Sequence, residues 1–310
     1  MESSRHVPVM MKEAIDMMDL QPEMIVVDAT LGGGSYTQEI YKRIMPGGTL
    51  IVCDQDMHAI ERFKKHNPEI AKNIHIVHSN YSHIRKILKD HNIDCVDAIV
   101  ADLGLSSDQI EETDRGFSFT SDVTIDMRMD QDRELSAYNV VNDYEQDELA
   151  RVIYEYGDER FSRRIANAIC RNRPIATGKQ LADVVVSSIP AKIRRKSKTH
   201  PATKTFQAIR IAVNDEYEHL KVFLTEGIDM LQKDGKFIVV SFHSGEDRLV
   251  KNIFRANARG CICSLDMPVC RCEHSPIVSV ITKKVVTPSF EEIERNPRAR
   301  SAKLRAVRKL

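Results

Sequence analysis

The 310-residue sequence predicts an α/β fold in which a parallel sheet is interrupted by a helical insertion. Three observations favour this fold. Over residues 1–108, short apolar runs alternate with helical patterns, which is typical of parallel strands covered by helices on both faces. Over 109–200 no apolar run resembles a strand, and over 201–310 the alternation resumes. We therefore expect 1–108 and 201–310 to form one discontinuous domain and 109–200 to form a second, helical one.

Each expected element follows from a local pattern. In the first segment, apolar runs bounded by polar or turn residues predict strands at 24–28, 49–53, 74–78 and 96–101. Apolar residues at helical spacing predict the helices between them, at 8–19, 35–44, 57–66 and 81–91.

The same patterns extend through the rest of the chain. The insertion shows helices at 145–156, 158–172 and 178–188, with Asp158 as the expected N-cap of the second and Thr177 of the third. One long helix follows, with its apolar face running from Phe206 to Leu231, and Gly235 ends it. The last elements expected are a strand at 236–241, a helix at 246–257 and a strand at 277–286.

The most informative segment is the turn after the first strand. That strand ends in Asp28, and Gly32, Gly33 and Gly34 follow, so backbone N–H groups can approach a ligand closely. Asp54 ends the second strand, about 20 residues further on, where an acidic side chain accepts hydrogen bonds from ribose hydroxyls. The dinucleotide fingerprint G-x-G-x-x-G is not met, which favours a ligand without phosphate, S-adenosylmethionine. The alternative is a plain tight turn with a solvated Asp54.

The fourth strand leads into candidate catalytic groups. It runs into Asp102, Gly104, Ser106, Ser107 and Gln109. Methylation of an exocyclic amino group needs acceptors for its N–H bonds and a donor held within about 3–3.5 Å, but no nucleophile or metal. Asp102, Ser106 and Ser107 are therefore candidates for that role. The alternative for Asp102 is a helix cap or strand-end turn.

Two further residues lie where predicted strands end. His243 follows the fifth strand and is a candidate acceptor or proton carrier, although a structural histidine is the alternative. Ser244 is expected to cap the next helix, with Asp247 in a loose capping box. Tyr81, after the third strand, is placed to stack on an adenine ring.

Composition and charge narrow the class of protein. The chain is 42% hydrophobic and 29% charged, as in ordinary globular proteins, with no apolar run of about 18 residues and no signal-peptide core. We therefore expect a cytoplasmic protein with no membrane partner. The formal charge is zero, but basic residues gather at 191–200 and 295–310. Such segments are typical of a protein that grips a polyanion at particular places, with solvated loops as the alternative.

Four of the seven cysteines form a cluster in the sequence. Cys261-Ile-Cys263 and Cys270-Arg-Cys272 are separated by six residues, whereas Cys53, Cys95 and Cys170 are scattered. Four thiols in so short a segment can hold one structural zinc, although C-x-C pairs are less typical of zinc sites than C-x₂-C. Unligated cysteines in a surface loop are the favoured alternative, so no metal ligand is assigned.

Eight segments in order along nearly the whole chain resemble signatures of the MraW family of ribosomal RNA methyltransferases: His6-Val-Pro-Val, Asp102-Leu-Gly-Leu-Ser-Ser, Arg115-Gly-Phe-Ser-Phe, Asp126-Met-Arg-Met-Asp, Tyr156-Gly-Asp-Glu-Arg-Phe, His200-Pro-Ala-Thr-Lys-Thr-Phe-Gln-Ala-Ile-Arg, Ser241-Phe-His-Ser and Asn296-Pro-Arg-Ala-Arg-Ser-Ala-Lys-Leu-Arg. The resemblance implies a Rossmann-like, S-adenosylmethionine-dependent methyltransferase sheet with a helical, RNA-recognising insertion. It also implies methylation of N4 of a cytidine in the decoding region of 16S ribosomal RNA within the small subunit.

The motifs and the resemblance together define the expected site. The catalytic residues are Asp102, Ser106, Ser107 and His243, and the cofactor-binding residues are Gly32, Gly34, Ser35, Tyr36, Asp54, Tyr81, Asp102 and Gln109. Ser35 and Tyr36 depart from the family loop, which resembles Gly-x-Gly-Gly-His-Ser.

These departures leave open a non-catalytic, RNA-binding ribosome-assembly factor with a relic cofactor pocket. A methyltransferase of protein or DNA is a third possibility, but DNA amino-methylases show a two-proline motif that is missing here. A homodimer also stays open.

Overall fold

The computed structural model describes residues 8–105, 115–196, 199–261, 263, 272 and 274–310. The chain divides into two compact units. Met1–Gly104 and Tyr217–Leu310 form the first, which we call the sheet unit, and Leu105–Glu216 form the second, the helical unit. The chain thus leaves the sheet unit once and returns once.

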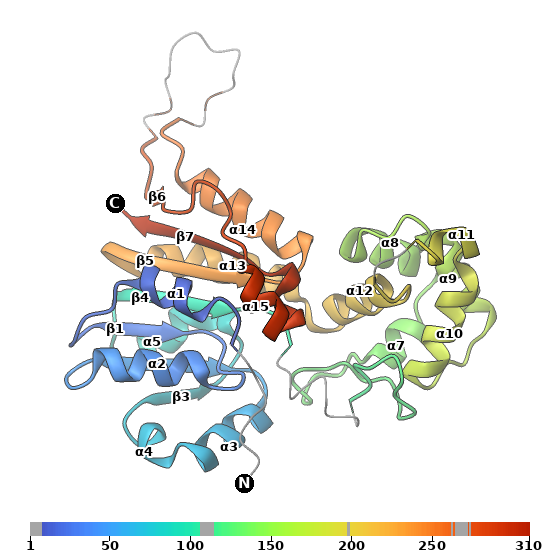
Figure 1. Ribbon diagram of the computed structural model, residues 1–310, viewed down its shortest axis with the longest axis horizontal. Coiled ribbons are helices and arrows are strands. Elements are labelled where there is room, and N and C mark those ends of the chain that lie inside the picture. The colour runs from blue at the N-terminus through green and yellow to red at the C-terminus, as the bar shows by residue number, and fades with distance from the viewer. Residues whose placement is uncertain (1–7, 106–114, 197–198, 262, 264–271, 273) are drawn as a thin grey trace. The chain divides into compact units, whose positions relative to one another are not determined.

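A seven-stranded sheet with the order β3-β2-β1-β4-β5-β7-β6 forms the centre of the sheet unit (Figure 1). Its first five strands are parallel, whereas β7 runs antiparallel to both β5 and β6. The strands are β1 Ile25–Asp28, β2 Thr49–Asp54, β3 His75–His78, β4 Val96–Asp102, β5 Leu231–Ser241, β6 Val278–Val280 and β7 Lys303–Lys309. The predicted α/β class and the first five strands are confirmed.

Alternating side chains of each central strand enter two separate apolar cores. In β2, Leu50 and Val52 face one core, and Ile51 and Cys53 face the other. The first core is covered by α1 Met11–Met18, α2 Ser35–Ile44 and α3 Met57–His66. The second is covered by α5 Ile84–Asp90, α13 Glu216–Met230 and α14 Ser244–Asn257. Burial on both faces explains why these strands read as continuous apolar runs.

The helical unit has an apolar core of its own, in which Val140, Ile153, Ile169 and Val185 are fully buried. Its helices are α7 Ala137–Asn142, α8 Gln146–Gly157, α9 Ser162–Arg171, α10 Gly178–Ser188, α11 Ala191–Arg194 and α12 Thr203–Asn214. The short elements α4 Pro68–Ala71, η1 Tyr81–His83, α15 Phe290–Arg295 and η2 Pro297–Ser301 belong to the sheet unit. Among the described residues, none of the helices has the length and apolar character that crossing a membrane requires.

Two helix caps test the local predictions. Thr177 caps α10 as predicted, in a reciprocal capping box with Gln180. Asp158 does not cap α9: it is the C-cap of α8, in the left-handed region at φ 48°, and α9 begins only at Ser162. Aspartate tolerates the left-handed conformation, which is common at the C-terminal end of a helix. Because aspartate is also a common N-cap, the sequence did not distinguish the end of α8 from the start of α9.

The predicted long helix is two helices. Asp215 adopts φ 50° and ends α12, and α13 starts at Glu216. An apolar face at helical spacing continues across this break, so the periodicity did not reveal it. As a result α12 belongs to the helical unit, which extends to Glu216 rather than ending at residue 200.

The basic segment 295–310 is not a free tail. Lys303–Lys309 forms β7, an interior strand between β5 and β6, in which Leu304, Ala306 and Val307 are buried. Arg305 Nε donates to Asp247 Oδ1 at 2.6 Å, and Lys303 Nζ donates to Asp247 Oδ2 at 3.1 Å. Both cations thus already pair with one buried carboxylate, which makes them less available to grip phosphate than the sequence suggested. The predicted last strand, at 277–286, is reduced to the three residues of β6.

Candidate active site

Three aspartates end three neighbouring strands of the sheet. Asp28 ends β1 and pairs in register with Val52 of β2 and Val100 of β4. Asp54 and Asp102 each lie two residues beyond those partners, so they flank the turn after Asp28 from both sides. The order of the strands reverses between β1 and β4, and open α/β sheets bind their ligands at such a switch point.

The glycine turn after β1 is held against the end of β2. The Gly32 N–H donates to Asp54 Oδ2 at 3.0 Å, and the Leu31 N–H donates to the Cys53 carbonyl at 3.3 Å. Gly34 is the N-cap of α2 at φ 78°, and a Cβ there would lie 2.3 Å from the Phe63 ring. Both its conformation and its contact with Phe63 therefore require glycine at position 34. Specific contacts therefore hold the glycine turn, which disfavours the alternative of a plain tight turn.

Asp54 supports the turn and keeps acceptor capacity. Besides the Gly32 N–H, its carboxylate accepts the Asp56 N–H at Oδ1, at 2.8 Å. An ionised carboxylate has about four acceptor positions, so acceptor capacity remains for a ribose hydroxyl. Burial raises the pKa of Asp54 to about 6, because desolvation outweighs the main-chain hydrogen bonds from Gly32, Asp56 and Gln55.

Asp28 has a structural role. Its side chain accepts the Thr37 hydroxyl at 2.6 Å and the Thr30 N–H at 3.2 Å, and it is 1% exposed. Burial raises the pKa of Asp28 to about 7, and the neighbouring Asp54 adds to the rise. Asp28 therefore connects the end of β1 to α2, and it is Asp54 and Asp102 that have acceptors left for a ligand.

Asp102 carries an unsatisfied acceptor. Its N–H donates to the Thr30 hydroxyl at 2.8 Å, which positions the end of β4 beside the glycine turn. Its Oδ1 atom is buried and has no hydrogen-bond partner among the described residues. Burial raises the pKa of Asp102 well above its usual value, and the charges of Asp28, Glu246 and Glu292 raise it further. A buried acceptor without a donor is uncommon and marks a place where a ligand group completes the bonding.

His243 is the N-cap of α14, a position predicted for Ser244. Its Nδ1 atom accepts the Glu246 N–H at 3.4 Å, its Nε2 atom lies 3.1 Å from Glu246 Oε1, and the same carboxylate accepts the Phe242 N–H. Asp247 takes no part in the cap because it pairs with β7. The Nδ1 atom of His243 therefore has a structural role in the cap, whereas its buried Nε2 atom makes no hydrogen bond among the described residues and stays a candidate acceptor or proton carrier.

The remaining predicted site residues differ in whether their side chains are available to a ligand. Tyr36 is 4% exposed and its hydroxyl donates to the Val9 carbonyl at 2.7 Å, so only its main chain faces the turn. Ser35 is the partly exposed first residue of α2. The Tyr81 ring packs against Phe223, with the two ring centroids 4.9 Å apart. Ser106, Ser107 and Gln109 lie outside the described residues, so their predicted roles stay predictions.

The helical unit contains a basic pocket of its own. Sequence reasoning singled out two of its cations, Arg194 and Lys196, from the basic segment. The others come from elsewhere in the chain, so only the tertiary structure shows them: the full lining is Glu159, Arg160, Phe161, Ile189, Ile193, Arg194, Lys196, Thr199, His200, Pro201 and Lys204. The Nε atom of Arg194 is buried without a hydrogen-bond partner among the described residues. This pocket combines positive charge with an aromatic ring, as sites for nucleic acid do.

The family follows from the whole chain. The model of the MraW methylase family matches residues 3–310. This chain belongs to the MraW methylase family. It is 43% identical to a Brevibacillus brevis protein named ribosomal RNA small subunit methyltransferase H, and 44% identical to proteins of that name from Clostridium botulinum and Caldicellulosiruptor bescii. The first two alignments cover 99% of this chain and the third covers 98%, with 99% of each relative covered.

This MraW methylase is therefore a methyltransferase, and its methyl donor is S-adenosylmethionine. The described residues fit that cofactor. The turn at Gly32 and Gly34 adopts positive φ angles beside the end of β2, and Asp54 keeps acceptor capacity for ribose.

Proposed function

We propose that this MraW methylase methylates N4 of a cytidine in the decoding region of 16S ribosomal RNA. The observation that carries the proposal is the buried, unpaired carboxylate oxygen of Asp102 beside the glycine turn. The names of the relatives, which are small-subunit ribosomal RNA methyltransferases, support the choice of RNA. A cytosine amino group presents the N–H donors that this oxygen lacks.

In this proposal the protein supplies alignment and hydrogen-bond acceptors. When bound, S-adenosylmethionine supplies an electrophilic methyl group on a sulfonium ion. Asp54 holds the ribose, and Asp102 Oδ1 accepts an N–H of the amino group and directs the nitrogen lone pair at the methyl carbon. As the new N–C bond forms, the nitrogen loses a proton, which the ionised carboxylate of Asp102 would accept at Oδ1.

Recognition of the RNA is assigned to the helical unit. Arg160, Arg194, Lys196 and Lys204 line one pocket together with Phe161, whose ring can stack on a base. Phosphate contacts of this kind orient the RNA, and stacking of an unpaired base is typical of RNA recognition. We assign Ser106 and Ser107 to contacts with the base, as the sequence predicts, and His243, the N-cap of α14, to a positioning role.

The departures at Ser35 and Tyr36 give less support to a relic cofactor pocket than the sequence suggested. The Tyr36 side chain points into the apolar core and its hydroxyl is bonded to Val9, so replacing the family's histidine there leaves the face of the turn unchanged. Catalysis is therefore the proposal, and the non-catalytic assembly factor becomes an outcome of its test.

The test is methylation of purified small ribosomal subunits with labelled donor, followed by mass spectrometry of the nucleosides of 16S RNA. We expect Asp102→Ala and Asp102→Asn to lower the rate by about 10²–10⁴-fold, the usual loss for a group that accepts a proton. Both variants should still bind S-adenosylhomocysteine by calorimetry. Asp229→Asn, at an exposed pair with Arg85, is the matched control.

Full activity of Asp102→Ala would remove this site from the reaction. Label in DNA or protein rather than RNA, or methylation at a cytosine atom other than N4, would overturn the proposed substrate. Binding of the subunit with no methyl transfer by the unaltered protein would establish the assembly factor instead.

A further inference from the structure

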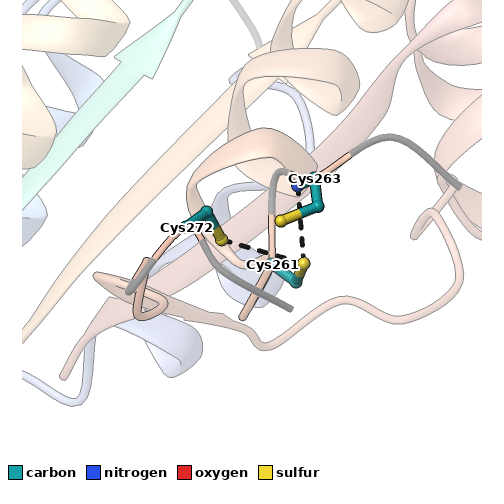
Figure 2. Close-up of side chains that lie close together, drawn as sticks. All are labelled: Cys261, Cys263 and Cys272. Carbon is teal, nitrogen blue, oxygen red and sulfur yellow. Dashed lines mark hydrogen bonds between the residues drawn. The ribbon is translucent and has the colours of Figure 1, made fainter. Parts of the chain in front are cut away.

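Three thiols gather in the connection between α14, which ends at Asn257, and β6, which begins at Val278 (Figure 2). Of the described residues between Ala258 and Ile277, none belongs to either apolar core of the sheet unit. Burial of apolar side chains therefore does not account for how the described part of this connection is held.

The three sulfur atoms lie close enough together to ligate one metal ion. The Sγ atoms of Cys261, Cys263 and Cys272 all lie within 4.8 Å of one another, and those of Cys261 and Cys272 are 3.8 Å apart. A disulfide would need about 2.05 Å. Zinc–sulfur bonds of about 2.3 Å at tetrahedral angles place two sulfur atoms about 3.8 Å apart. The observed separation therefore matches two thiolates that share one zinc ion.

The main chain adds a second indication. The Cys263 N–H donates to Cys261 Sγ at 3.4 Å (Figure 2). Outer-shell hydrogen bonds of this kind orient metal ligands and stabilise their negative charge. Cys261 is exposed, and Cys263 and Cys272 are partly exposed, so a metal can reach all three without unfolding the core. By contrast, Cys53 is fully buried between strands, and burial raises the pKa of its thiol.

We propose that Cys261, Cys263 and Cys272 bind one structural zinc ion that fixes the connection between α14 and β6. Each thiol that is protonated beforehand releases its proton as its zinc–sulfur bond forms, and no electron is transferred. Structural zinc takes four ligands, and the sequence has a further thiol at Cys270, which lies outside the described residues and carries no part of the argument. The sequence alone favoured unligated thiols, whereas the sulfur geometry favours ligation.

The ion has a structural task at this position. β6 has only three residues and lies at the edge of the sheet, paired with β7 alone. A metal that ties the connection together lowers the entropy of the chain leading into this short strand. The site lies on a different segment from Asp54 and Asp102, so its loss is expected to loosen the connection and leave cofactor binding intact.

The experiment measures zinc in the full chain, purified under reducing conditions from zinc-supplemented medium. Elemental analysis should find about one zinc per chain. Cys261→Ser and Cys272→Ser should each lower that content at least tenfold, while Cys95→Ser, at an exposed lone thiol, should retain it. Replacement by cobalt should give the visible bands of tetrahedral thiolate coordination, and hydrogen exchange should accelerate in 258–277 of the two zinc-deficient variants.

Several results would overturn the proposal. Wild-type protein without zinc and without cobalt bands contradicts it, as does a Cys261–Cys272 disulfide or an iron–sulfur chromophore. Equal loss of zinc from Cys95→Ser would place the ion elsewhere. Because the readouts are metal content, spectra and hydrogen exchange, the result does not depend on methyltransferase activity or on whether the proposed RNA is the substrate.

Discussion

Replacing Asp54 by asparagine tests the proposed ribose contact. The Asp54 carboxylate accepts the Gly32 N–H and the Asp56 N–H, and its remaining acceptor capacity is available to the ribose diol of the cofactor. A hydrogen bond to a charged acceptor contributes about 1.5–3 kcal/mol. Asparagine keeps one oxygen and turns the other into a donor, so we expect a loss of about 2–3 kcal/mol, or roughly 30- to 150-fold weaker binding of the cofactor.

The same change affects folding little, because two contributions oppose each other. Asparagine leaves one of the two main-chain N–H groups without an acceptor, which costs about 1–3 kcal/mol. It also removes a charge whose pKa burial raises from 3.8 to about 6, which relieves about 3 kcal/mol at neutral pH. A weaker binding constant in Asp54→Asn is therefore a statement about the ligand and not about a damaged fold.

The assay is calorimetry with S-adenosylhomocysteine from pH 8 to pH 5. The ionised carboxylate is the form that accepts from ribose, so the wild-type protein loses affinity as Asp54 takes up a proton below about pH 6. The ratio of wild-type to variant affinity reports mainly on Asp54, because the other residues are common to both proteins. That ratio should be roughly 30–150 at pH 8 and fall about tenfold at pH 5. A ratio near one at pH 8, or one that does not change with pH, would refute the reasoning, and Asp229→Asn should match the wild type throughout.

Two further predictions concern the interiors of the two units. Arg305→Met removes one of the two cations that face the buried Asp247 and should lower the free energy of unfolding by about 3 kcal/mol in urea titrations at pH 7. The hydrogen bonds from Arg305 and Lys303 outweigh the effect of burial, so the pKa of Asp247 is lowered. The loss of unfolding free energy in Arg305→Met should therefore shrink as pH falls below about 4 and Asp247 is protonated. A loss that does not change with pH would contradict this. Asn214→Ala removes the hydrogen bonds that its side chain makes with the Met129 N–H and with the Met127 and Arg210 carbonyls, and should cost about 2–3 kcal/mol. Unchanged hydrogen exchange in that unit would show that Asn214 does not stabilise it.

Most of the sheet unit could be predicted because its elements follow from local pattern. The apolar runs that became β1, β2 and β4 are buried on both faces, and α2 and α3 have the bounds that the periodicity predicts. Thr177 was a recognisable cap for the same reason: a capping box depends on residues three positions apart. Asp54 and Asp102 were found as strand ends, before any contact was known.

What the sequence could not show depends on partners distant in the chain. β7 looked like a basic tail, since the need of Arg305 and Lys303 for Asp247 appears only when α14 packs beside the strand. The apolar residues keep their helical spacing across Asp215, yet this residue ends α12. Its left-handed conformation changes the direction of the chain without changing the spacing of apolar residues in the sequence. The basic pocket of the helical unit likewise joins Arg160 to Lys204, which no local spacing connects.

By itself, then, the order of residues determined the fold class, the glycine turn and the acidic strand ends, because these depend on neighbours along the chain. Only the tertiary structure decided how each acidic group is used: Asp28 is bonded to Thr37, Asp54 shares its acceptors, and Asp102 keeps an oxygen free among the described residues. The reason is physical. Burial and hydrogen-bond partners set the charge and the remaining capacity of a carboxylate, and both are properties of the packed molecule.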